Sequence, residues 1–340
     1  MEIKKYIRKT GVLLLTLLLV FCGSGCESLS EYQEIATELE RMAEDLEEEF
    51  GQEDATKDFS QENKAPGQDT NCAQRGGGRL EVHFLDVGQG DAALIRQGEH
   101  AMLIDGGDNS KGTAVQSYLQ SQGIKSLDYV IGTHPDADHV GGLDVILYKF
   151  SWQQVILPDV EKDTRTYQDV LKVIADKNQK ITRPRVGDTY ALGAAEFTVI
   201  APVKEDYGDS YNDYSVGILL TFGENRFVFT GDAEEDAEED MLSMGMDLSA
   251  DVFKAAHHGS DTANTMPFLE EVHPESVVIS CGEDNRYGHP RAEVLNNLRS
   301  MGIHVYRTDE QGTIVAVSDG STITWNCSPS ESWKAGEPSR

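Results

Sequence analysis

Short apolar runs alternate with helix-period stretches along most of the chain, from Leu80 to Trp325. Apolar runs of four to seven residues predict strands, and apolar residues repeated every three or four positions predict helices. The predicted strands are residues 82–85, 92–95, 101–105, 128–132, 153–157, 196–200, 216–222, 226–230, 252–255, 276–281, 303–306, 312–317 and 321–325. The predicted helices are residues 113–122, 141–149, 165–177, 233–243, 265–272 and 291–300. This order predicts an α/β fold with two mixed sheets and helices outside them, in one four-layer αββα sandwich.

The first 25 residues have the pattern of an export signal. Four basic residues precede an apolar run from Val12 to Phe21, which is shorter than a typical membrane-spanning helix. Small residues then lead to Cys26, and this arrangement resembles a bacterial lipoprotein signal. We therefore expect cleavage after residue 25, acylation of Cys26 and anchoring at the outer face of the bacterial cytoplasmic membrane. An uncleaved N-terminal anchor and ordinary secretion remain alternatives.

Residues 26–78 are predicted to form a helix followed by a linker. Apolar side chains between Tyr32 and Phe50 recur at steps of three and four, which predicts an amphipathic helix over residues 28–50. This stripe favours at most weak self-association, because three heptads make a marginal coiled coil. Residues 51–78 are polar and glycine-rich, which is typical of a flexible tether. The globular domain is expected over residues 79–327, with a polar tail over 328–340.

The net charge is unevenly distributed. Residues 1–26 carry four basic residues and one acidic residue, whereas residues 27–60 carry two basic and thirteen acidic residues. Residues 61–340 therefore hold −22 of the formal net charge of −30. Such an acidic surface repels nucleic-acid phosphates, which argues against tight binding of DNA without regard to sequence. The sequence contains no second long apolar run, so we do not expect a transmembrane channel.

Three cysteines remain after the signal and the predicted lipidation site. Cys281 ends an apolar run, which predicts an inert thiol in the core. Cys72 and Cys327 bracket the globular region, and an oxidising exterior would permit a disulfide between them. The sequence leaves this pairing open.

A cluster of metal-competent side chains follows the apolar run 129–131. His134, Asp136, Asp138 and His139 lie within six residues, immediately before two glycines. The backbone turns at the end of a strand, so these side chains can converge on one point. Imidazole nitrogen and carboxylate oxygen together suit Zn²⁺ or Mn²⁺. The alternative is an exposed acidic turn.

Three later clusters have the same placement after apolar strands. Asp232 follows the strand 226–230, His257 and His258 follow the strand 252–255, and the turn from Tyr287 to Pro290 contains His289. One such residue alone usually caps a turn. Several polar strand ends spread over the domain predict a shared site, because sites in α/β proteins collect at strand ends.

These segments resemble the metallo-β-lactamase-fold hydrolases, in particular the branch that forms the C-terminal domain of ComEC-type competence proteins. The resemblance covers about residues 80–326 and rests on the segments 84–92, 103–107, 133–142, 212–215, 230–232, 257–260 and 285–290. It implies a metal-dependent hydrolase with two divalent metal ions. The sequence has no counterpart of the competence proteins' membrane channel, so the resemblance does not imply DNA uptake.

The resemblance also implies ligands. It assigns His134 and Asp136 to one metal site, Asp138 and His139 to the other, and Asp232 to both. Most of the fold's members have a second histidine at the position of Asp136, whereas the ComEC-like branch has an aspartate there, as this sequence does. Within the histidine pair His258 is the expected ligand of the Asp138 site, but the order of the pair stays open.

A further histidine expected before Asp232 is missing, and Asn212 or Ser215 occupies that region. The site with His134 is therefore expected to bind Zn²⁺ more weakly and to shift toward Mn²⁺. Together with Tyr287, Asn212 and Ser215 are the residues that we expect to contact substrate.

The expected reaction is hydrolysis of a phosphodiester. Two dications lower the pKa of a bound water, and the resulting hydroxide attacks phosphorus. Asp138 is expected to orient it, and His257 and His289 to donate protons, although His289 has the alternative of a simple turn histidine. The resemblance favours DNA as substrate, and the acidic surface disfavours long duplexes, so a DNase acting on single strands is expected. A smaller phosphodiester is compatible with both observations. Amide or ester hydrolysis and a non-catalytic binding module are the remaining alternatives.

Overall fold

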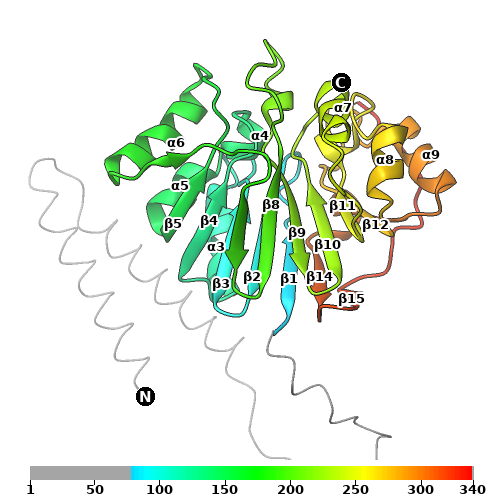
Figure 1. The fold of residues 1–340 in the computed structure, drawn as a ribbon, viewed down its shortest axis with the longest axis horizontal. Coiled ribbons are helices and arrows are strands. Elements are labelled where there is room, and N and C mark those ends of the chain that lie inside the picture. The colour runs from blue at the N-terminus through cyan, green and yellow to red at the C-terminus, as the bar shows by residue number, and fades with distance from the viewer. Residues whose placement is uncertain (1–77, 339–340) are drawn as a thin grey trace, which may run out of the picture. The chain divides into compact units, whose positions relative to one another are not determined.

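Two β-sheets form the centre of the fold, and helices cover their outer faces (Figure 1). The computed structural model describes residues 78–338. Several predictions concern residues outside this range. They are the signal peptide, the lipidation site Cys26, the helix 28–50, the linker up to residue 77, and Cys72. The two mixed sheets with outer helices confirm the predicted αββα sandwich. Within residues 78–338, no helix combines the length and apolarity that crossing a bilayer requires.

The strands are arranged as two sheets of eight and seven strands within the described residues. The first sheet has the order β15 (Ile323–Trp325), β14 (Ile314–Ser318), β1 (Leu80–Phe84), β2 (Ala93–Gln97), β3 (His100–Ile104), β4 (Ser126–Ile131), β5 (Ser151–Ile156) and β6 (Ile181–Thr182). The second has the order β13 (His304–Arg307), β12 (Ser276–Ile279), β11 (Val252–Lys254), β10 (Asn225–Phe229), β9 (Gly217–Phe222), β8 (Ala195–Ala201) and β7 (Thr189–Leu192). Strands β3 to β6 run parallel to one another, and so do β10 to β13. The carboxyl ends of each parallel group therefore meet at one edge of its sheet.

Helices connect the parallel strands. They are α3 (Gly112–Ser121), α4 (Ala137–Val140), α5 (Leu143–Lys149), α6 (Arg165–Asp176), α7 (Glu235–Ser243), α8 (Met266–Val272), α9 (Ala292–Ser300) and α10 (Thr308–Gln311), with single 3₁₀ turns η1 (Asn212–Tyr214) and η2 (Ala256–Gly259). Helix α6 begins at Thr164 and α8 at Thr265, and each threonine side chain accepts a hydrogen bond from the backbone N–H three residues later. Such caps stabilise a helix start by about 1 kcal/mol.

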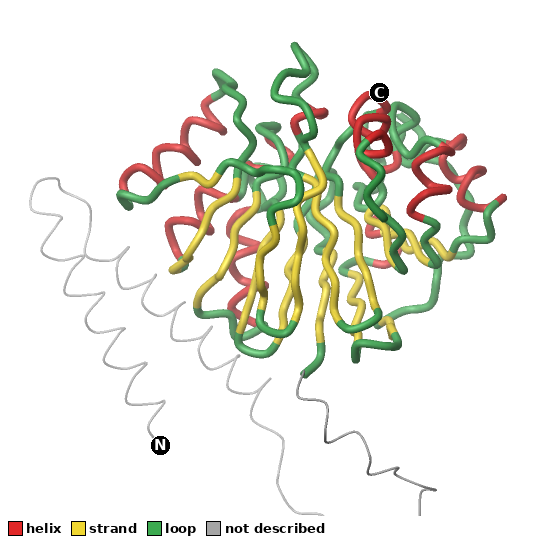
Figure 2. Tube along the Cα trace, in the orientation of Figure 1, coloured by secondary structure: helices red, strands yellow, loops and turns green. Residues whose placement is uncertain are grey.

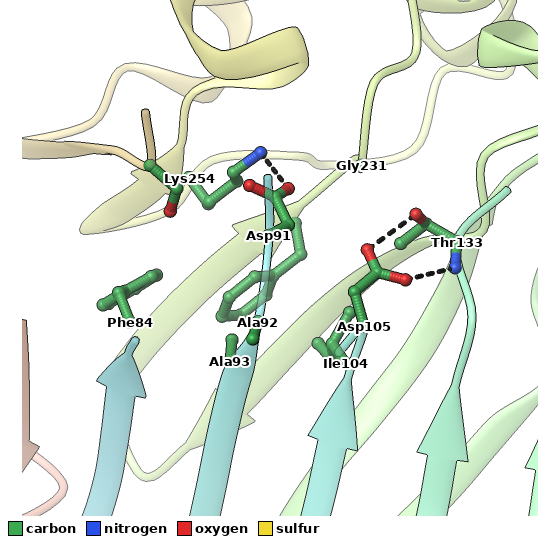
Figure 3. A pocket seen from close by; sticks show the side chains of 11 residues that line it. Phe84, Asp91, Ala92, Ala93, Ile104, Asp105, Thr133, Gly231 and Lys254 are labelled. Carbon is green, nitrogen blue, oxygen red and sulfur yellow. Dashed lines mark hydrogen bonds and ion pairs between the residues drawn. The ribbon is translucent and has the colours of Figure 1, made fainter. Parts of the chain in front are cut away.

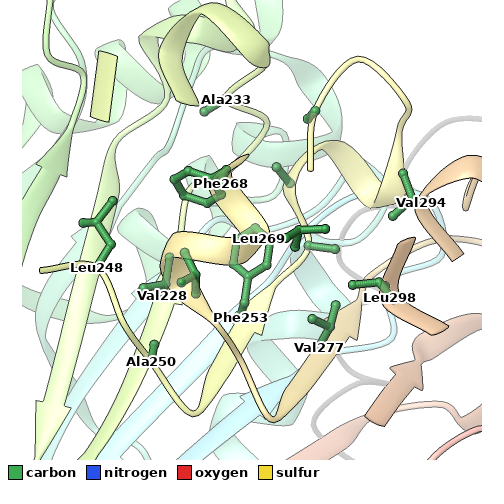
Figure 4. Close-up of a cluster of buried hydrophobic side chains, with 14 of the residues drawn as sticks. Val228, Ala233, Leu248, Ala250, Phe253, Phe268, Leu269, Val277, Val294 and Leu298 are labelled. Atoms are coloured by element: carbon green, nitrogen blue, oxygen red, sulfur yellow. The ribbon is translucent and has the colours of Figure 1, made fainter. Parts of the chain in front are cut away.

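Side chains that point alternately to the two faces of each sheet contribute to three apolar cores. In β3, Met102 and Ile104 lie in the core between the two sheets, whereas Ala101 and Leu103 lie in the core under the helices. This is the two-residue period of a strand that is buried on both faces. A third core lies between the second sheet and α7, α8 and α9, where Phe253 packs edge to face on Phe268 (Figure 4). The sheets are therefore fixed from both sides, and the strand ends that they carry have defined positions.

Several elements differ from the sequence prediction. Strands β6 and β7 and helix α10 were not predicted, because each has four residues or fewer and no clear apolar period. The helix predicted over 141–149 is α5, which begins at Leu143, and a separate short helix, α4, precedes it. Gly142 separates them, and a side chain there would meet the backbone oxygen of Gly106 at 2.2 Å. The close approach of these two loops explains why glycine is needed at the junction.

The C-terminal segment beyond β15 packs along the second sheet. Ser330 donates its backbone N–H to Val305, and Gly336 donates to Pro290, next to His289. Trp333 is partly buried against the core under α9. Residues 328–338 therefore contact the domain rather than extend from it.

The two described cysteines lie in different surroundings. Cys281 is buried, as predicted for a core thiol, and burial raises the pKa of its thiol. Cys327 is partly exposed, and its disulfide with Cys72 stays a prediction.

Candidate metal centre

The predicted site residues follow the carboxyl ends of parallel strands in both sheets. Asp105 follows β3 and His134 follows β4 in the first sheet, while Asp232 follows β10 and His258 follows β11 in the second. Long loops gather at this edge of the sandwich, and tight turns connect strands at the opposite edge (Figure 2). Ligand sites in α/β proteins occur at such carboxyl ends.

Four side chains direct one donor atom each toward a common point. The Nε2 atom of His139 is 3.1 Å from Oδ2 of Asp232 and 3.4 Å from Nε2 of His258. The Nε2 atom of His258 is 3.4 Å from Oδ2 of Asp232 and 3.4 Å from Oδ2 of Asp138. Donors at about 2.1 Å from a tetrahedral ion lie about 3.4 Å from one another. His139, Asp232 and His258 therefore have the mutual spacing that one divalent cation requires, and Asp138 lies at the same distance from His258.

The charges of this cluster favour a cation. Burial alone would lower the pKa of His258, but the Asp232 and Asp91 carboxylates outweigh burial and raise it to about 10. Burial would likewise lower the pKa of His139, but the Asp232 and Asp105 carboxylates raise it well above its ordinary value. Burial would raise the pKa of Asp232, yet His139 and His258 keep it well below the usual range. The protons on the imidazoles balance buried carboxylates, which is the role that a divalent cation fills when it binds.

Asp105 holds His139 from the rear. One carboxylate oxygen of Asp105 accepts from His139 Nδ1 at 2.8 Å. The same oxygen accepts from the Thr133 hydroxyl at 2.7 Å, and the other accepts from the Thr133 backbone N–H (Figure 3). On the opposite side, Nδ1 of His258 donates to the backbone oxygen of Ser280 at 2.9 Å. Both hydrogen bonds leave Nε2 free to face the cluster. Such partners fix the tautomer and the orientation of metal-binding histidines.

Asp91 and Lys254 form a buried ion pair behind the same histidines (Figure 3). The Asp91 carboxylate lies 3.3 Å from Nδ1 of His258 and 3.9 Å from Nδ1 of His139. Asp91 is thus close enough to share a cation with His139, Asp232 and His258, whose donor atoms lie within 4.8 Å of one another. We nevertheless assign the inner position to Asp138, because Asp138 faces the Nε2 side and Asp91 faces the Nδ1 side. The sequence analysis gave no role to Asp91, Asp105 or Lys254, although both carboxylates belong to strand-end segments.

A second group of donors lies on the other side of Asp232. Nε2 of His134 is 4.0 Å from Oδ2 of Asp232, and both Nε2 and Asp232 Oδ1 are buried without a hydrogen-bond partner among the described residues. Burial, and then the His139 charge, lower the pKa of His134 to about 4, so its imidazole is neutral and free to bind a cation. Asp136 is less buried, and its carboxylate lies 2.5 Å from Nζ of Lys162. Buried unpartnered nitrogen and oxygen fit a second cation here.

Ser215 occupies the rear of this second group. Its hydroxyl oxygen lies 3.3 Å from Nδ1 of His134 and accepts from the backbone N–H of Asp232 at 3.1 Å. Ser215 is fully buried. The predicted contact with substrate is therefore wrong for Ser215, because its hydroxyl is enclosed and positions His134 instead.

A pocket of about 130 Å³ opens above the two groups of donors. Its lining contains most of the predicted site residues together with one that was not predicted, Gln89; the lining residues are Gln89, Asp136, Asp138, Asn212, Asp232, His257, His258, Tyr287 and His289. The cluster of buried donors thus lies at the floor of an accessible pocket, as catalysis requires.

The histidine pair is split between floor and wall. Both His257 and His258 have positive φ angles, 46° and 55°, so the backbone turns sharply and directs the two rings to different sides. His258 is buried at the cluster, whereas His257 is partly exposed, with Nε2 3.8 Å from Oδ2 of Asp232. On its other side, Nδ1 of His257 lies 3.1 Å from Glu234, which the sequence analysis missed. This geometry assigns His258 to the cation and His257 to the pocket wall.

His289 and Tyr287 form the far wall. Their rings stack at 5.7 Å, and the rings of His289 and His257 lie 5.4 Å apart. Burial, and then the His258 charge, lower the pKa of His289 to about 4. His289 is therefore a neutral hydrogen-bonding group in this pocket.

A two-sheet sandwich whose facing strand ends bring imidazoles and carboxylates to one buried point defines the class of metal-dependent hydrolases. The chain belongs to the metallo-beta-lactamase superfamily, whose family model matches residues 85–283.

Relatives of this chain include proteins of natural competence. ComE operon protein 3 of Bacillus subtilis is 29% identical over 252 residues, which cover 69% of this chain and 32% of that protein. Recombination protein 2 of Haemophilus influenzae is 29% identical over 242 residues, with 69% and 28% covered, and competence protein ComA of Neisseria gonorrhoeae is 26% identical over 235 residues, with 68% and 31% covered. The match thus spans about a third of the length of these curated relatives, and it confirms the predicted ComEC-like resemblance.

One solved structure to which the chain is similar comes from Bacillus subtilis. The metallo-beta-lactamase fold protein YhfI from Bacillus subtilis superposes with a TM-score of 0.48 at 14% identity, covering 71% of this chain and 100% of that chain.

Proposed function

We propose that this protein is a metal-dependent phosphodiesterase that acts on single-stranded DNA or on a small phosphodiester. One observation carries the proposal: the buried donor cluster forms the floor of a pocket whose walls hold two imidazoles outside the cluster, His257 and His289. A cluster that only stored metal would not need free imidazoles beside an open pocket. Relatives named for competence and recombination favour DNA over other phosphodiesters.

The donor sets fit two cations. Asp138, His139, Asp232 and His258 would hold the first, and His134, Asp136 and Asp232 the second, each as Zn²⁺ or Mn²⁺. When bound, such cations lower the pKa of a water ligand toward neutrality and neutralise negative charge on a phosphoryl oxygen.

The chain's own residues supply orientation and protons. Asp138 lines the pocket and directs one oxygen to the cluster, so its other oxygen can accept a hydrogen bond from the attacking water. Glu234 holds Nδ1 of His257, which leaves Nε2 facing the pocket. His257 is therefore the group that protonates the leaving oxygen, and neutral His289 donates a hydrogen bond to the phosphoryl group.

The rim of the pocket supports a preference for single strands. Tyr287 is 39% exposed, and the guanidinium of Arg286 lies 4.7 Å from the centre of its ring. An exposed aromatic ring beside a cation stacks with an unpaired base but not with a base inside a duplex. Asn212 on η1 completes the lining as an uncharged hydrogen-bonding group.

Hydrolysis of an amide or ester is the second candidate, because the same water and the same cations serve both reactions. The pairing of Glu234 with His257 favours the phosphodiester, since it orients Nε2 toward the pocket, where it can donate a proton to an alkoxide leaving group. A non-catalytic binding module would not require this acid. We further propose that the protein is exported and held at the outer face of the bacterial membrane through lipid on Cys26, where a substrate from outside the cell would meet it.

A substrate panel after metal analysis tests the proposal. The chain is purified without chelator, its metal content is measured, and rates are compared on single-stranded DNA, duplex DNA, a chromogenic phosphodiester and a chromogenic β-lactam. We expect turnover of the phosphodiester and of single strands in the presence of Mn²⁺ or Zn²⁺. Turnover of the β-lactam alone would reject a phosphodiesterase, and bound metal without any turnover would favour a binding module.

A further inference from the structure

We infer that Lys162 makes the two cation positions unequal in affinity. Its ammonium group pairs with Asp136, a carboxylate of the second position, and competes there with the cation for the negative charge. This inference rests on the proposed metal sites but not on the identity of the substrate. Lys162 lies in the loop between β5 and α6, and its Nζ lies 2.5 Å from Oδ1 of Asp136. The Lys162 side chain is 21% exposed, so most of it is withdrawn from water.

A second contact holds the ammonium in place. Nζ of Lys162 lies 4.3 Å from the centre of the Tyr211 ring, and an ammonium over an aromatic face is attracted to it. Tyr211 directly precedes η1, which carries the pocket residue Asn212. Lys162 therefore connects two loops at the pocket rim, and its position is set by the fold rather than by Asp136 alone.

Even without the effect of Lys162, the second position has the weaker set of metal donors. Its donors are His134, Asp136 and Asp232, and Ser215 stands behind His134 where a further imidazole was expected. Lys162 neutralises one of the two carboxylates in this set. A dication that binds there must share Asp136 with an ammonium group of like charge, which lowers its affinity.

Among residues 78–338, Asp138 and Asp232 of the first position pair with histidines and form no ion pair with a lysine or arginine. Lys254 is paired with Asp91 behind the histidines. We therefore expect a tightly bound cation between Asp138, His139, Asp232 and His258, and a second one that is bound much more weakly.

Metal titration of lysine variants tests the inference without reference to activity. The full chain is stripped of metal and titrated with Mn²⁺ and with Zn²⁺ by calorimetry, as wild type, Lys162→Met, Lys162→Arg and Lys172→Met. Lys172 is a matched control, because it pairs with Asp176 on the exposed face of α6, away from the pocket. We expect one tight and one weak site in the wild type, and a second site tightened roughly tenfold or more in Lys162→Met.

The controls define what would overturn the inference. Lys162→Arg and Lys172→Met should keep the wild-type ratio of affinities, and the first site should be unchanged in all variants. Two equal sites in the wild type, or a second site that Lys162→Met leaves unchanged, would refute the role of Lys162. Absence of any bound cation in the wild type would instead refute the proposed metal sites. Should Lys162→Met fail to fold, Lys162→Gln replaces it, and Tyr211→Leu is expected to shift the second affinity in the same direction.

Discussion

Each inward imidazole of the cluster depends on a carboxylate behind it. Asp105 holds His139 directly, and Asp91 approaches His258 while paired with Lys254. The Asp91–Lys254 pair is buried, so replacing only one of the two residues by a neutral one leaves an unpaired charge in the core. The pair therefore contributes to stability, and Asp91 adds a carboxylate 3.3 Å from Nδ1 of His258, the atom that also donates to Ser280. These two contributions can be separated by mutation.

The first prediction separates the two roles of this pair. Asp91→Asn should lower the free energy of unfolding of the metal-free chain by about 3–5 kcal/mol, because Lys254 is left buried without its counter-charge. The double variant Asp91→Leu, Lys254→Met should recover most of that stability. Its affinity for the first cation should nevertheless stay about 10–100-fold below wild type, because His258 lacks the carboxylate on Nδ1.

Denaturant unfolding and metal titration on the same preparations check this result. If the double variant recovers both stability and metal affinity, the pair has no part in positioning His258.

The second prediction concerns the carboxylate that both donor sets share. Asp232→Asn should lower turnover at least roughly a hundredfold and reduce the bound metal, because an amide cannot supply the negative charge that two cations require. Metal content by mass spectrometry and rates on a chromogenic phosphodiester provide the measurement. Asp169→Asn on the exposed side of α6 is the control and should change neither. Normal metal content and turnover in Asp232→Asn would remove Asp232 from the site.

The sequence identifies the donors of this site better than their supports. His134, Asp138 and His139 are recognisable because they fall together at one strand end, in residue types that bind metals. Asp91 and Lys254 belong to different sheets and carry no local pattern that pairs them. The placement of Ser215 was also not predictable, because a hydroxyl in a loop gives no sign of whether it faces a pocket or the interior.

At the scale of the elements, long and regular segments are predictable and short ones are not. Helices α3, α6 and α9 lie within one or two residues of their predicted bounds, because apolar periods and caps both define them. Strand β6 has two residues and exists only through its pairing with β5. The packing of residues 328–338 was missed for the same reason, because a polar segment without regular structure gives no pattern to read.

Helix α7 carries an acidic residue that faces the interior. Glu238 is fully buried, and its carboxylate accepts hydrogen bonds from the backbone N–H groups of Asn264 and Thr265 at 2.7 and 2.9 Å. These bonds connect α7 to the start of α8. Burial raises the pKa of Glu238 to about 7, above its ordinary value of 4.5. Folding therefore takes up a proton at this residue between these two pH values.

The third prediction follows from this pKa. The folded protein favours protonated Glu238, so its contribution to stability is complete below about pH 4.5 and is lost as the pH rises through about 7. The stability difference between wild type and Glu238→Ala should therefore shrink by about 2–3 kcal/mol from pH 4.5 to pH 7.5. Unfolding in denaturant across this range is the measurement, with Glu239→Ala on the exposed side of α7 as control. A difference that is constant or grows with pH would contradict the burial argument.

At the scale of the whole molecule, we expect the N-terminal segment to determine where the domain works. The fourth prediction is that Cys26→Ser leaves an unprocessed precursor and blocks metabolic labelling with a fatty acid, because acylation needs the thiol at this position. Cys327→Ser keeps the signal intact and should label as wild type does. Fatty-acid labelling that survives in Cys26→Ser would show that the protein is exported by another route.

The charge of the whole domain governs the choice between nucleic-acid substrates. Residues 61–340 carry a net charge of −22, while the positive charge expected near the site is limited to the metal positions, Lys162 and Arg286. A stiff duplex brings many phosphates against this acidic surface, whereas a flexible single strand can bend one phosphate into the pocket. Affinity for DNA must then come from one or two phosphates at the metals and from stacking on Tyr287.

The fifth prediction is that cleavage of single strands exceeds cleavage of duplexes and depends weakly on salt. Each neutralised phosphate of a single strand contributes about −0.7 to the slope of log affinity against log salt, so two phosphates give a slope of about −1.4. The measurement is the cleavage rate at subsaturating substrate, from low to physiological salt, on single and double strands of matched sequence and increasing length. Rates on duplexes should fall with length, because each added turn adds repulsion. A steep slope with preference for long duplexes would mean that DNA binds along an extended basic surface, which the acidic composition of this domain argues against.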